Sequence, residues 1–277
     1  MSNTLKYPRI TVVTPNYNQA NFIEKTIQSV INQDYPNLEY IIIDGGSTDG
    51  SVEIIKKYEK SLAYWESEPD NGMYHAINKG FSKATGEIMC WINSDDVLWE
   101  KSLFNVAKIM SSNKHIHWLQ GFPSVINEEG ALIDQREQVF SKYFFYWYQH
   151  EKSFAFVQQE STFWRKELWE KVGSSIDTNY TLAADFDLWM RFLNYKKMYC
   201  TQIQLGAFRK RHGQKSSNQE LYLAETRTSI ARNFVKLGIS DKFVIKFGRL
   251  LKKLNTPLII KFNNKFQKLL IGKPNMV

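Results

Sequence analysis

Short apolar runs alternate with helical apolar patterns at the start of the chain. The β-branched runs ITVVT at 10–14 and EYIIID at 39–44 are typical of buried parallel strands. Between them, residues 21–33 carry apolar side chains at helical spacing. A strand, a helix and a strand in this order predict a right-handed βαβ crossover.

The alternation continues to about residue 100. We expect helices over 51–60 and 74–84 and a third buried strand over 87–92, the run EIMCWI. These elements predict an α/β sheet of the nucleotide-binding type over at least residues 8–100. Further on, the pattern predicts a strand near 161–164, a helix over 185–195 and helical structure from 216 onward.

The chain becomes amphipathic and basic from Asp241. Apolar residues recur there at helical spacing, lysines and arginines share that period, and the pattern resumes after Pro257. The apolar positions are Phe243, Phe247, Leu250, Leu251, Leu254, Leu258, Phe262, Phe266, Leu269 and Leu270, and the basic ones include Lys242, Lys246, Arg249 and Lys253. Such helices lie on anionic membrane surfaces. The alternative is that the apolar stripe packs on the main domain and the lysines face solvent.

Charge is distributed unevenly along the chain. The net charge is +8, and residues 241–277 hold nine Lys/Arg and one acidic residue, so residues 1–240 hold 27 of each sign. The neutral main part argues against nucleic-acid binding. Cys90 and Cys200 have no CxxC spacing and are expected to be reduced thiols of a cytosolic protein. We expect neither a signal peptide nor a membrane span.

Polar segments follow each predicted strand, and the second of them is rich in glycine. They are TPNYN at 14–18, DGGSTDG at 44–50 and NSDD at 93–96. In open α/β sheets, ligands bind beyond the carboxyl ends of the strands. Each segment taken alone is equally compatible with an ordinary turn. All three together predict a ligand site at one edge of the sheet.

Two adjacent carboxylates end the third segment. Asp95 and Asp96 repel each other unless a cation or a basic partner lies beside them. Mg²⁺ or Mn²⁺ prefers one or two carboxylates together with phosphate oxygens of a substrate. The alternative is that one of the two caps the helix expected at 102–110.

Six motifs in order give the chain a family resemblance. ITVVTPNYNQ, DGGSTDGS, EPDNGMYHAINKG, ATGEIMCWINSDD, QQESTFWRKELWEKVG and ADFDLWMR resemble the family 2 glycosyltransferases over about residues 8–213. The resemblance implies a GT-A fold, which is a Rossmann-like mixed sheet flanked by helices. It further implies a catalytic domain at 1–215, with a nucleotide-binding half at about 8–100 and an acceptor-side half at about 101–215. Residues 216–277 would form the amphipathic helical tail.

The resemblance also assigns residues to the nucleotide, the metal and the donor sugar. The nucleotide-binding positions are Pro15, Tyr17, Asn18, Asp44, Asp70, Asn71 and Asn78. Gly45 stands where the family's DDGS motif has its second Asp, and the role of His75 is open. NSDD matches the DXD motif with Asn93 in place of the first Asp. Asp95 is the expected metal ligand, His212 completes metal or diphosphate binding, and Ser94 and Asp96 lie near the donor sugar.

The resemblance also assigns the catalytic base and the residues on the acceptor side. Asp185 matches the family's catalytic base, with Ala184 in place of the preceding Glu; the alternatives are a helix cap and Asp187 as the base. Gln159 and Glu160 match an acceptor-side loop, or they form a hydrogen-bonded pair at a strand edge. The aromatic segment at 140–148 either stacks on acceptor sugars or a lipid carrier, or packs over the sheet.

The expected function is an inverting, metal-dependent transfer of a sugar from a UDP-sugar to a glycan or lipid-linked hydroxyl in polysaccharide biosynthesis. The cofactor is Mn²⁺ or Mg²⁺, and the protein is expected to be cytoplasmic and peripheral on the inner face of the cell membrane. One alternative function is that of a nucleotidyltransferase, which would require a glycine-rich basic loop where this chain has TPNYNQAN. The other is a non-catalytic basic binding module.

Overall fold

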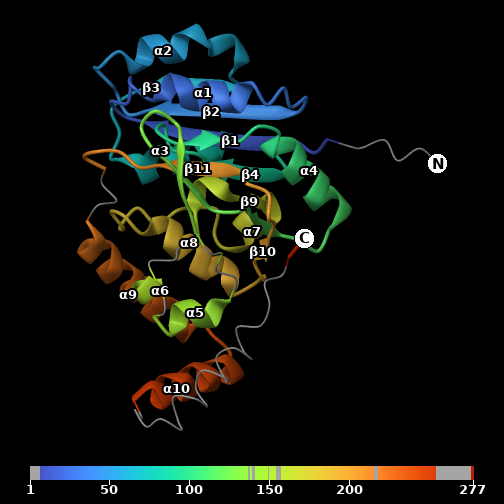
Figure 1. The fold of residues 1–277 in the computed structure, drawn as a ribbon, viewed down its shortest axis with the longest axis vertical. Helices are drawn as coiled ribbons and strands as arrows, with labels where there is room; N and C mark the ends of the chain where they lie inside the picture. Colours follow the sequence, from blue (N-terminus) through green and yellow to red (C-terminus); the bar gives the residue numbers. More distant parts are fainter. Residues whose placement is uncertain are drawn as a thin grey trace, which may run out of the picture.

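A computed structural model of the chain describes residues 7–136, 138, 141–148, 150–153, 157–214, 218–253 and 276–277. The amphipathic pattern expected after Lys253, including its continuation beyond Pro257, lies outside these residues. Within them the chain folds as a mixed α/β protein, which confirms the expected fold class (Figure 1).

A seven-stranded sheet forms the centre, with the strand order β10-β6-β9-β4-β1-β2-β3. Its strands are β1 (Ile10–Asn16), β2 (Leu38–Asp44), β3 (Tyr64–Ser67), β4 (Ile88–Trp91), β6 (Trp118–Gln120), β9 (Thr162–Arg165) and β10 (Tyr199–Cys200). The first four are parallel, and β9 runs antiparallel to both of its neighbours. The carboxyl ends of β1 to β4 therefore meet at one edge of the sheet.

The helices of the first half connect these strands as βαβ units. They are α1 (Ile23–Ile31), α2 (Ser51–Lys57), α3 (Met73–Lys83) and α4 (Ser102–Ser112), with a 3₁₀ turn η1 (Glu59–Ser61) after α2. The expected helices are confirmed to within a few residues, except that the one predicted over 51–60 ends at Lys57 before this turn. α3 packs on β1 and β2, where Gly80 lets the helix approach so closely that a Cβ there would meet Val13 at 2.4 Å.

A smaller four-stranded sheet lies beside the first, in the order β5-β11-β7-β8. It consists of β5 (Val97–Leu98), β7 (Ser124–Ile126), β8 (Leu132–Gln135) and β11 (Gly206–Arg209). Because β5 follows NSDD directly and pairs with β11, this sheet brings the segment after residue 205 next to Asp95 and Asp96.

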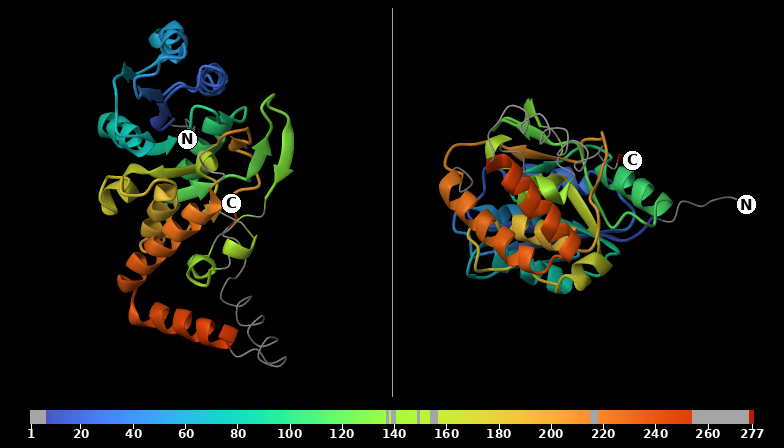
Figure 2. Two further views of the ribbon diagram at one scale, coloured as in Figure 1. Left: turned by 90° about the vertical axis from the view of Figure 1, so that its left-hand side faces the viewer. Right: turned by 90° about the horizontal axis from the view of Figure 1, so that it is seen from below.

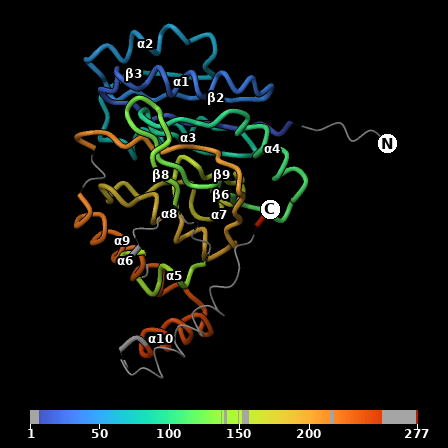
Figure 3. The backbone as a smooth tube through the Cα atoms, viewed as in Figure 1, coloured from blue at the N-terminus to red at the C-terminus, as the bar shows by residue number. Residues whose placement is uncertain are grey.

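Most of the remaining helices lie away from β3, with α7 beside the sheet and α10 farthest from β3 (Figures 2 and 3). They are α5 (Lys142–Tyr146), α6 (His150–Ser153), α7 (Lys166–Lys171), α8 (Ala184–Leu193), α9 (Gln219–Val235) and α10 (Ile239–Lys253), and η2 (Gln159–Ser161) precedes β9. One hydrophobic core runs from Ile10 to Ile245, so α9 and α10 share it with the seven-stranded sheet rather than forming a separate body.

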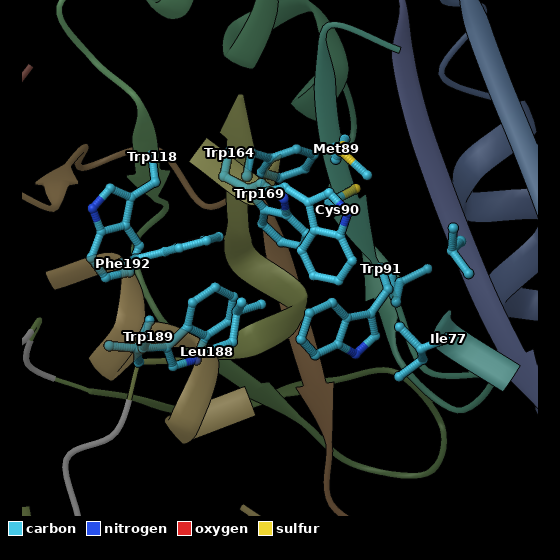
Figure 4. Packing of buried hydrophobic residues seen from close by; sticks show 14 of the residues in the cluster. Ile77, Met89, Cys90, Trp91, Trp118, Trp164, Trp169, Leu188, Trp189 and Phe192 are labelled. Carbon is cyan, nitrogen blue, oxygen red and sulfur yellow. The ribbon is translucent and has the colours of Figure 1, made fainter. Parts of the chain in front are cut away.

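Tryptophans fix α8 against the sheet (Figure 4). The ring of Trp189 stacks on Trp91 of β4 at 5.8 Å between centroids and on Trp118 of β6 at 5.7 Å. All three rings are buried. The aromatic segment is buried as well at Phe145, Tyr146 and Trp147, so for these residues packing, and not stacking on a sugar, is the outcome.

No helix within the described ranges has an apolar stretch long enough to cross a membrane. The two cysteines, Cys90 and Cys200, are buried free thiols, as expected.

Candidate active site

Four polar loops lie together at the carboxyl edge of the parallel strands. Tyr17 and Asn18 follow β1, Gly45 to Gly50 follow β2, Asp70 and Asn71 lie just beyond β3, and Asn93 to Asp96 follow β4. We call these loops the nucleotide edge. The register pairs Asn16 with Asp44 at the tips of β1 and β2, so the first two loops start from the same level.

Asp44 organises the nucleotide edge from within. Its side chain has no exposed surface and accepts five hydrogen bonds: from the Asn16 amide (2.6 Å), the Ser67 hydroxyl (2.6 Å), the backbone N–H of Gly46 (3.1 Å), and the N–H (2.9 Å) and hydroxyl (2.5 Å) of Ser47. Burial alone would raise the pKa of Asp44, but these hydrogen bonds outweigh it and lower the pKa. Asp44 therefore sits beneath the surface that a nucleotide would touch.

Ser47 ties the first two loops together. Its hydroxyl oxygen accepts from the backbone N–H of Asn18 at 2.8 Å, and the Asn18 side chain accepts from the N–H of Thr48 at 2.9 Å. Asn18 has φ 51°, a left-handed conformation that Asn tolerates better than most residues. The arrangement leaves Tyr17 60% exposed with its ring available for stacking, whereas Pro15 is buried in β1.

Asp70 occupies the space that Gly45 leaves open. A Cβ on Gly45 would meet the Asp70 carboxylate at 3.0 Å. The departure from the DDGS motif thus has a physical counterpart, because the carboxylate at this place comes from the loop after β3 instead of from residue 45. Asn71 beside it is exposed.

Asp95 is paired with an arginine from the second sheet's side. Its Oδ2 accepts from Arg211 Nε at 2.7 Å, and its backbone carbonyl accepts from Arg209 Nε at 2.6 Å. Both guanidinium groups lie over the ring of Phe22, at 5.4 and 5.6 Å. The partner of Asp95 is therefore Arg211 and not His212. The His212 side chain is exposed, and its backbone N–H donates to the Glu128 side chain at 2.9 Å.

Behind Asp95 lie three more carboxylates, and together with it we call them the acidic cluster: Asp95, Asp96, Glu160 and Asp185. Asp96 and Glu160 are buried. Burial, and then the charges of Asp95 and Glu160, raise the pKa of Asp96 well above its ordinary value. Burial also raises the pKa of Glu160 to about 8, with Asp185 and Asp95 adding to the effect. Charges act on one another across several ångström. The geometry places Glu160 near two of the others, because η2 contacts β4 and β5, the strands on either side of Asp95 and Asp96.

Asp185 is the second residue of α8 and not its cap, which is Ala183. Its Oδ1 accepts from the N–H of Phe186 at 2.7 Å. Burial raises the pKa of Asp185 to about 7, partly opposed by this hydrogen bond and further supported by the charge of Glu225. A carboxyl with such a pKa is suited to accept a proton near neutral pH. Asp187, in contrast, is held by Arg191 at 2.8 Å and the Ser229 hydroxyl at 2.8 Å inside the core.

Divalent metal chemistry fits the donor set of the acidic cluster. Asn93 Oδ1 and Glu160 Oε1 are buried oxygens without a hydrogen-bond partner in the described structure. Within the same residues, no three His, Cys, Asp or Glu side chains form a metal cage on their own. A hard cation on Asp95 completed by phosphate oxygens is the arrangement that Mg²⁺ uses in nucleotide enzymes. Arg211 would have to release Asp95 for this.

Several expected site residues have other neighbours. Asn78 exchanges two hydrogen bonds with the backbone of Ile176, at 2.7 and 2.8 Å, and lines a separate cavity of about 450 Å³ with Arg191, Arg232 and Lys236. The amide of Gln159 donates to the carbonyl of Trp91, which holds η2 against β4. Both side-chain amides thus bond to the backbone of neighbouring segments and stabilise the fold.

Asp96 and Ser94 lie beneath the surface as well. Asp96 Oδ1 accepts from the N–H of Arg209 at 2.7 Å, and Thr26 donates to its backbone carbonyl at 2.7 Å, so neither residue offers its side chain freely to a donor sugar. The alternative that Asp95 or Asp96 caps α4 is wrong, since the cap residue is Lys101. Sequence reasoning missed Arg209 and Arg211, although both stand beside His212 in FRKRH.

The mixed sheet flanked by helices, with polar loops at the carboxyl ends of its parallel strands, is the GT-A fold that the sequence predicts. The protein-family model of glycosyl transferase family 2 matches residues 11–177. This chain belongs to that family.

Among curated relatives, the chain is 32% identical over 133 residues to the putative teichuronic acid biosynthesis glycosyltransferase TuaG of Bacillus subtilis. The match covers 46% of this chain and 52% of TuaG. The chain spans about a third to about half the length of the first curated relatives it matches.

Solved structures share the fold. S. aureus TarS 1–349 in complex with UDP-GlcNAc matches with a TM-score of 0.66 at 18% identity, covering 95% of this chain and 81% of that one. The mannosyltransferase PcManGT from Pyrobaculum calidifontis in complex with GDP-Man and Mn²⁺ matches with a TM-score of 0.55 at 16% identity, covering 96% and 86%.

Proposed function

We propose that this protein transfers a hexose or N-acetylhexosamine from a UDP-sugar to a hydroxyl of a glycan or lipid-linked acceptor, with inversion, in polysaccharide biosynthesis. The observation that carries the proposal is the convergence of the nucleotide edge and the acidic cluster. Asp95 lies between β4 and β5, which both contact the turn η2 that carries Glu160, and the charges of Asp95 and of Asp185 on α8 both act on Glu160. The solved TarS complex holds UDP-GlcNAc, and TuaG is named for teichuronic acid biosynthesis.

The residues of the chain divide the work between donor and acceptor. The exposed ring of Tyr17 stacks on the base, and Asn18, Asp70 and Asn71 face the ribose and diphosphate. Asp95 holds the divalent ion, and His212 lies next to Arg211, which contacts Asp95. A bound Mg²⁺ or Mn²⁺ supplies Lewis-acid stabilisation of the leaving diphosphate.

Asp185 acts as the base. The acceptor hydroxyl attacks the anomeric carbon as the bond to the diphosphate breaks, and Asp185 takes the hydroxyl proton, which typically contributes about 10²–10⁴-fold to the rate. A single displacement inverts the anomeric configuration. Glu160 is buried, and its pKa is raised to about 8, so at neutral pH it adds no second negative charge near the attacking oxygen.

A screen of nucleotide sugars tests the donor assignment. Binding to the native state raises the melting temperature by mass action, so the correct UDP-sugar stabilises the protein only together with Mn²⁺ or Mg²⁺. The best donor is then followed for transfer with glycan and lipid-linked acceptors. Stabilisation by a purine nucleotide sugar without any by UDP-sugars contradicts the assignment.

We also propose that the outer face of α10 contacts an anionic membrane. Ile239, Phe243 and Leu250 are 89%, 68% and 52% exposed on one side of the helix, with exposed Lys246 among them. The opposite side packs on α5 and Trp147 through buried Ile245 and Leu251, and Asp241 pairs with Lys142 at 2.6 Å. One face of α10 thus packs on the rest of the protein, and the other face is exposed and available for the proposed membrane contact.

Vesicle sedimentation tests this contact with point variants, because deleting α10 would expose the core beneath it. Phe243→Asp is expected to reduce binding to phosphatidylglycerol vesicles severalfold without changing the melting temperature. Ile133→Asp, at a residue 51% exposed on β8, is the matched control and should bind as before. Equal loss in both variants contradicts the proposal.

A further inference from the structure

The helix that carries Asp185 begins without a cap of its own. The cap position of α8 is Ala183, which has no side-chain acceptor. The N–H groups at the start of a helix have no partner within the helix and need one from elsewhere. Asp185 follows this uncapped position by two residues, so whatever holds the backbone there also aims its carboxylate.

Glu225 of α9 holds the segment that leads into this cap position. Its Oε1 accepts from the N–H of Thr181 at 2.8 Å, and its Oε2 accepts from the N–H groups of Leu182 and Ala183, both at 2.8 Å. A carboxylate that accepts three backbone N–H groups makes charge-assisted hydrogen bonds, and its charge complements the positive end of the helix. α9 packs against α8 in the same part of the molecule (Figure 1).

We propose that Glu225 is the positioning residue of the catalytic base: it clamps the backbone of Thr181 to Ala183 and thereby sets where the Asp185 carboxylate meets the acceptor hydroxyl. The proposal rests on Asp185 being the base of the proposed function. It adds a residue from α9, which lies beyond the part of the chain matched by the family model.

The groups around Asp185 come from three elements. Glu225 and Tyr222 belong to α9, Tyr74 to α3 and Glu160 to η2. The Tyr74 hydroxyl oxygen accepts from the N–H of Ala184 at 3.3 Å, which continues the clamp by one residue. Of these four groups, Glu225 is the one that both holds the backbone and raises the pKa of Asp185 by its charge.

Glu225→Gln and Glu225→Asp, assayed in the full chain with the donor found active, test the proposal. Glutamine removes the charge and puts an NH₂ group against backbone donors, so kcat should fall about 10- to 100-fold, as expected for a displaced catalytic group. KM for the donor should stay within about twofold, because the nucleotide edge is untouched. The acid limb of the pH–rate profile should move to lower pH, since a neighbouring negative charge is lost. Aspartate keeps the charge and should restore the position of that limb.

Glu220→Gln is the matched control, as Glu220 is an exposed residue in the first turn of the same helix. It should leave kcat and the pH profile unchanged. A Glu225→Gln variant with a lowered melting temperature but the wild-type acid limb and kcat shows a role in stability alone and overturns the proposal.

A readout independent of turnover separates this proposal from the proposed function. Carboxyl ¹³C NMR of protein labelled at Asp, with Asp185→Asn for assignment, follows the titration of Asp185 directly. The proposal expects a lower midpoint in Glu225→Gln than in wild type, and an unchanged midpoint overturns it. If the wild-type chain transfers no sugar while this midpoint moves, the proposed function fails and the positioning contact stands.

Discussion

The nucleotide edge and the acidic cluster both contain buried carboxylates, yet their pKa values shift in opposite directions. Asp44 receives five hydrogen bonds and its pKa is lowered, whereas Glu160 has an oxygen without a partner in the described structure and its pKa is raised to about 8. The difference lies in the donors that the fold supplies, since burial alone raises the pKa of every carboxyl. In the first region the fold satisfies the Asp44 carboxylate, whereas in the second a buried oxygen of Glu160 has no hydrogen-bond partner among the described residues.

The largest effect is expected at the base. Asp185→Asn should lower the transfer rate about 10²–10⁴-fold, because the amide cannot accept the hydroxyl proton. The affinity for UDP, measured by calorimetry, should change little. Asp187→Asn is the comparison variant and should lower the melting temperature while turnover persists. Loss of turnover in the Asp187 variant together with normal turnover in Asp185→Asn would make Asp187 the base.

Removing the centre of the nucleotide edge is expected to cost stability. Asp44→Ala leaves the donors of Asn16, Ser47 and Ser67 without their acceptor, so the free energy of unfolding should fall by about 3 kcal/mol. Urea denaturation monitored by tryptophan fluorescence measures the change. Asp49→Asn, in an exposed part of the same loop, is the control and should cost less than about 1 kcal/mol. Equal losses in the two variants would mean that Asp44 does not organise the loops.

Metal and nucleotide together should stabilise the protein through Asp95. At a ligand concentration of 100 times Kd the gain is about 2.7 kcal/mol. Asp95→Ala should abolish the part that depends on Mn²⁺ or Mg²⁺ in a thermal shift assay with UDP. Arg211→Ala should instead strengthen the binding of the ion alone, since the carboxylate is no longer paired. If the metal-dependent part survives in Asp95→Ala, Asp95 does not hold the ion.

A smaller effect is expected from the pH dependence of stability. The pKa of Glu160 is raised in the folded protein above the ordinary value of 4.5, so the folded state binds more protons between about pH 4.5 and 8. The free energy of unfolding should therefore fall as the pH rises through this window. Glu160→Gln should flatten the fall when denaturation is measured without metal. Parallel curves for the two proteins would remove Glu160 from the acidic cluster.

The sequence predicted the parallel half of the fold because the hydrophobic period there reports burial directly. β3 was missed: its four residues YWES are half-buried and carry no β-branched run, and the strand is held by pairing with β2 at the edge of the sheet. The loops that hold Tyr17 and Asp95 could be placed from the rule that ligands bind at the carboxyl edge. Asp70, which follows the missed strand β3, was placed by the family resemblance alone.

Contacts between distant segments were beyond the reach of the pattern. Arg211 reaches Asp95 across 116 positions, and Glu225 reaches Leu182 across 43, because β5 pairs with β11 and α9 packs on α8. The expected roles of Asn78 and Gln159 came from motif position, yet their amides bond to Ile176 and Trp91. A motif places a residue on an element, and only the packing decides which way its side chain turns.

A crystal structure of the chain with UDP and Mn²⁺ tests the central claim most directly. The account predicts the uracil on Tyr17, the diphosphate between Asp70 and Asp95 with the ion on Asp95, and Asp185 facing the open side of the β-phosphate. The cavity lined by Asn78, Arg191 and Arg232 is the nearest competing location. UDP bound there, with the nucleotide edge empty, would contradict the account.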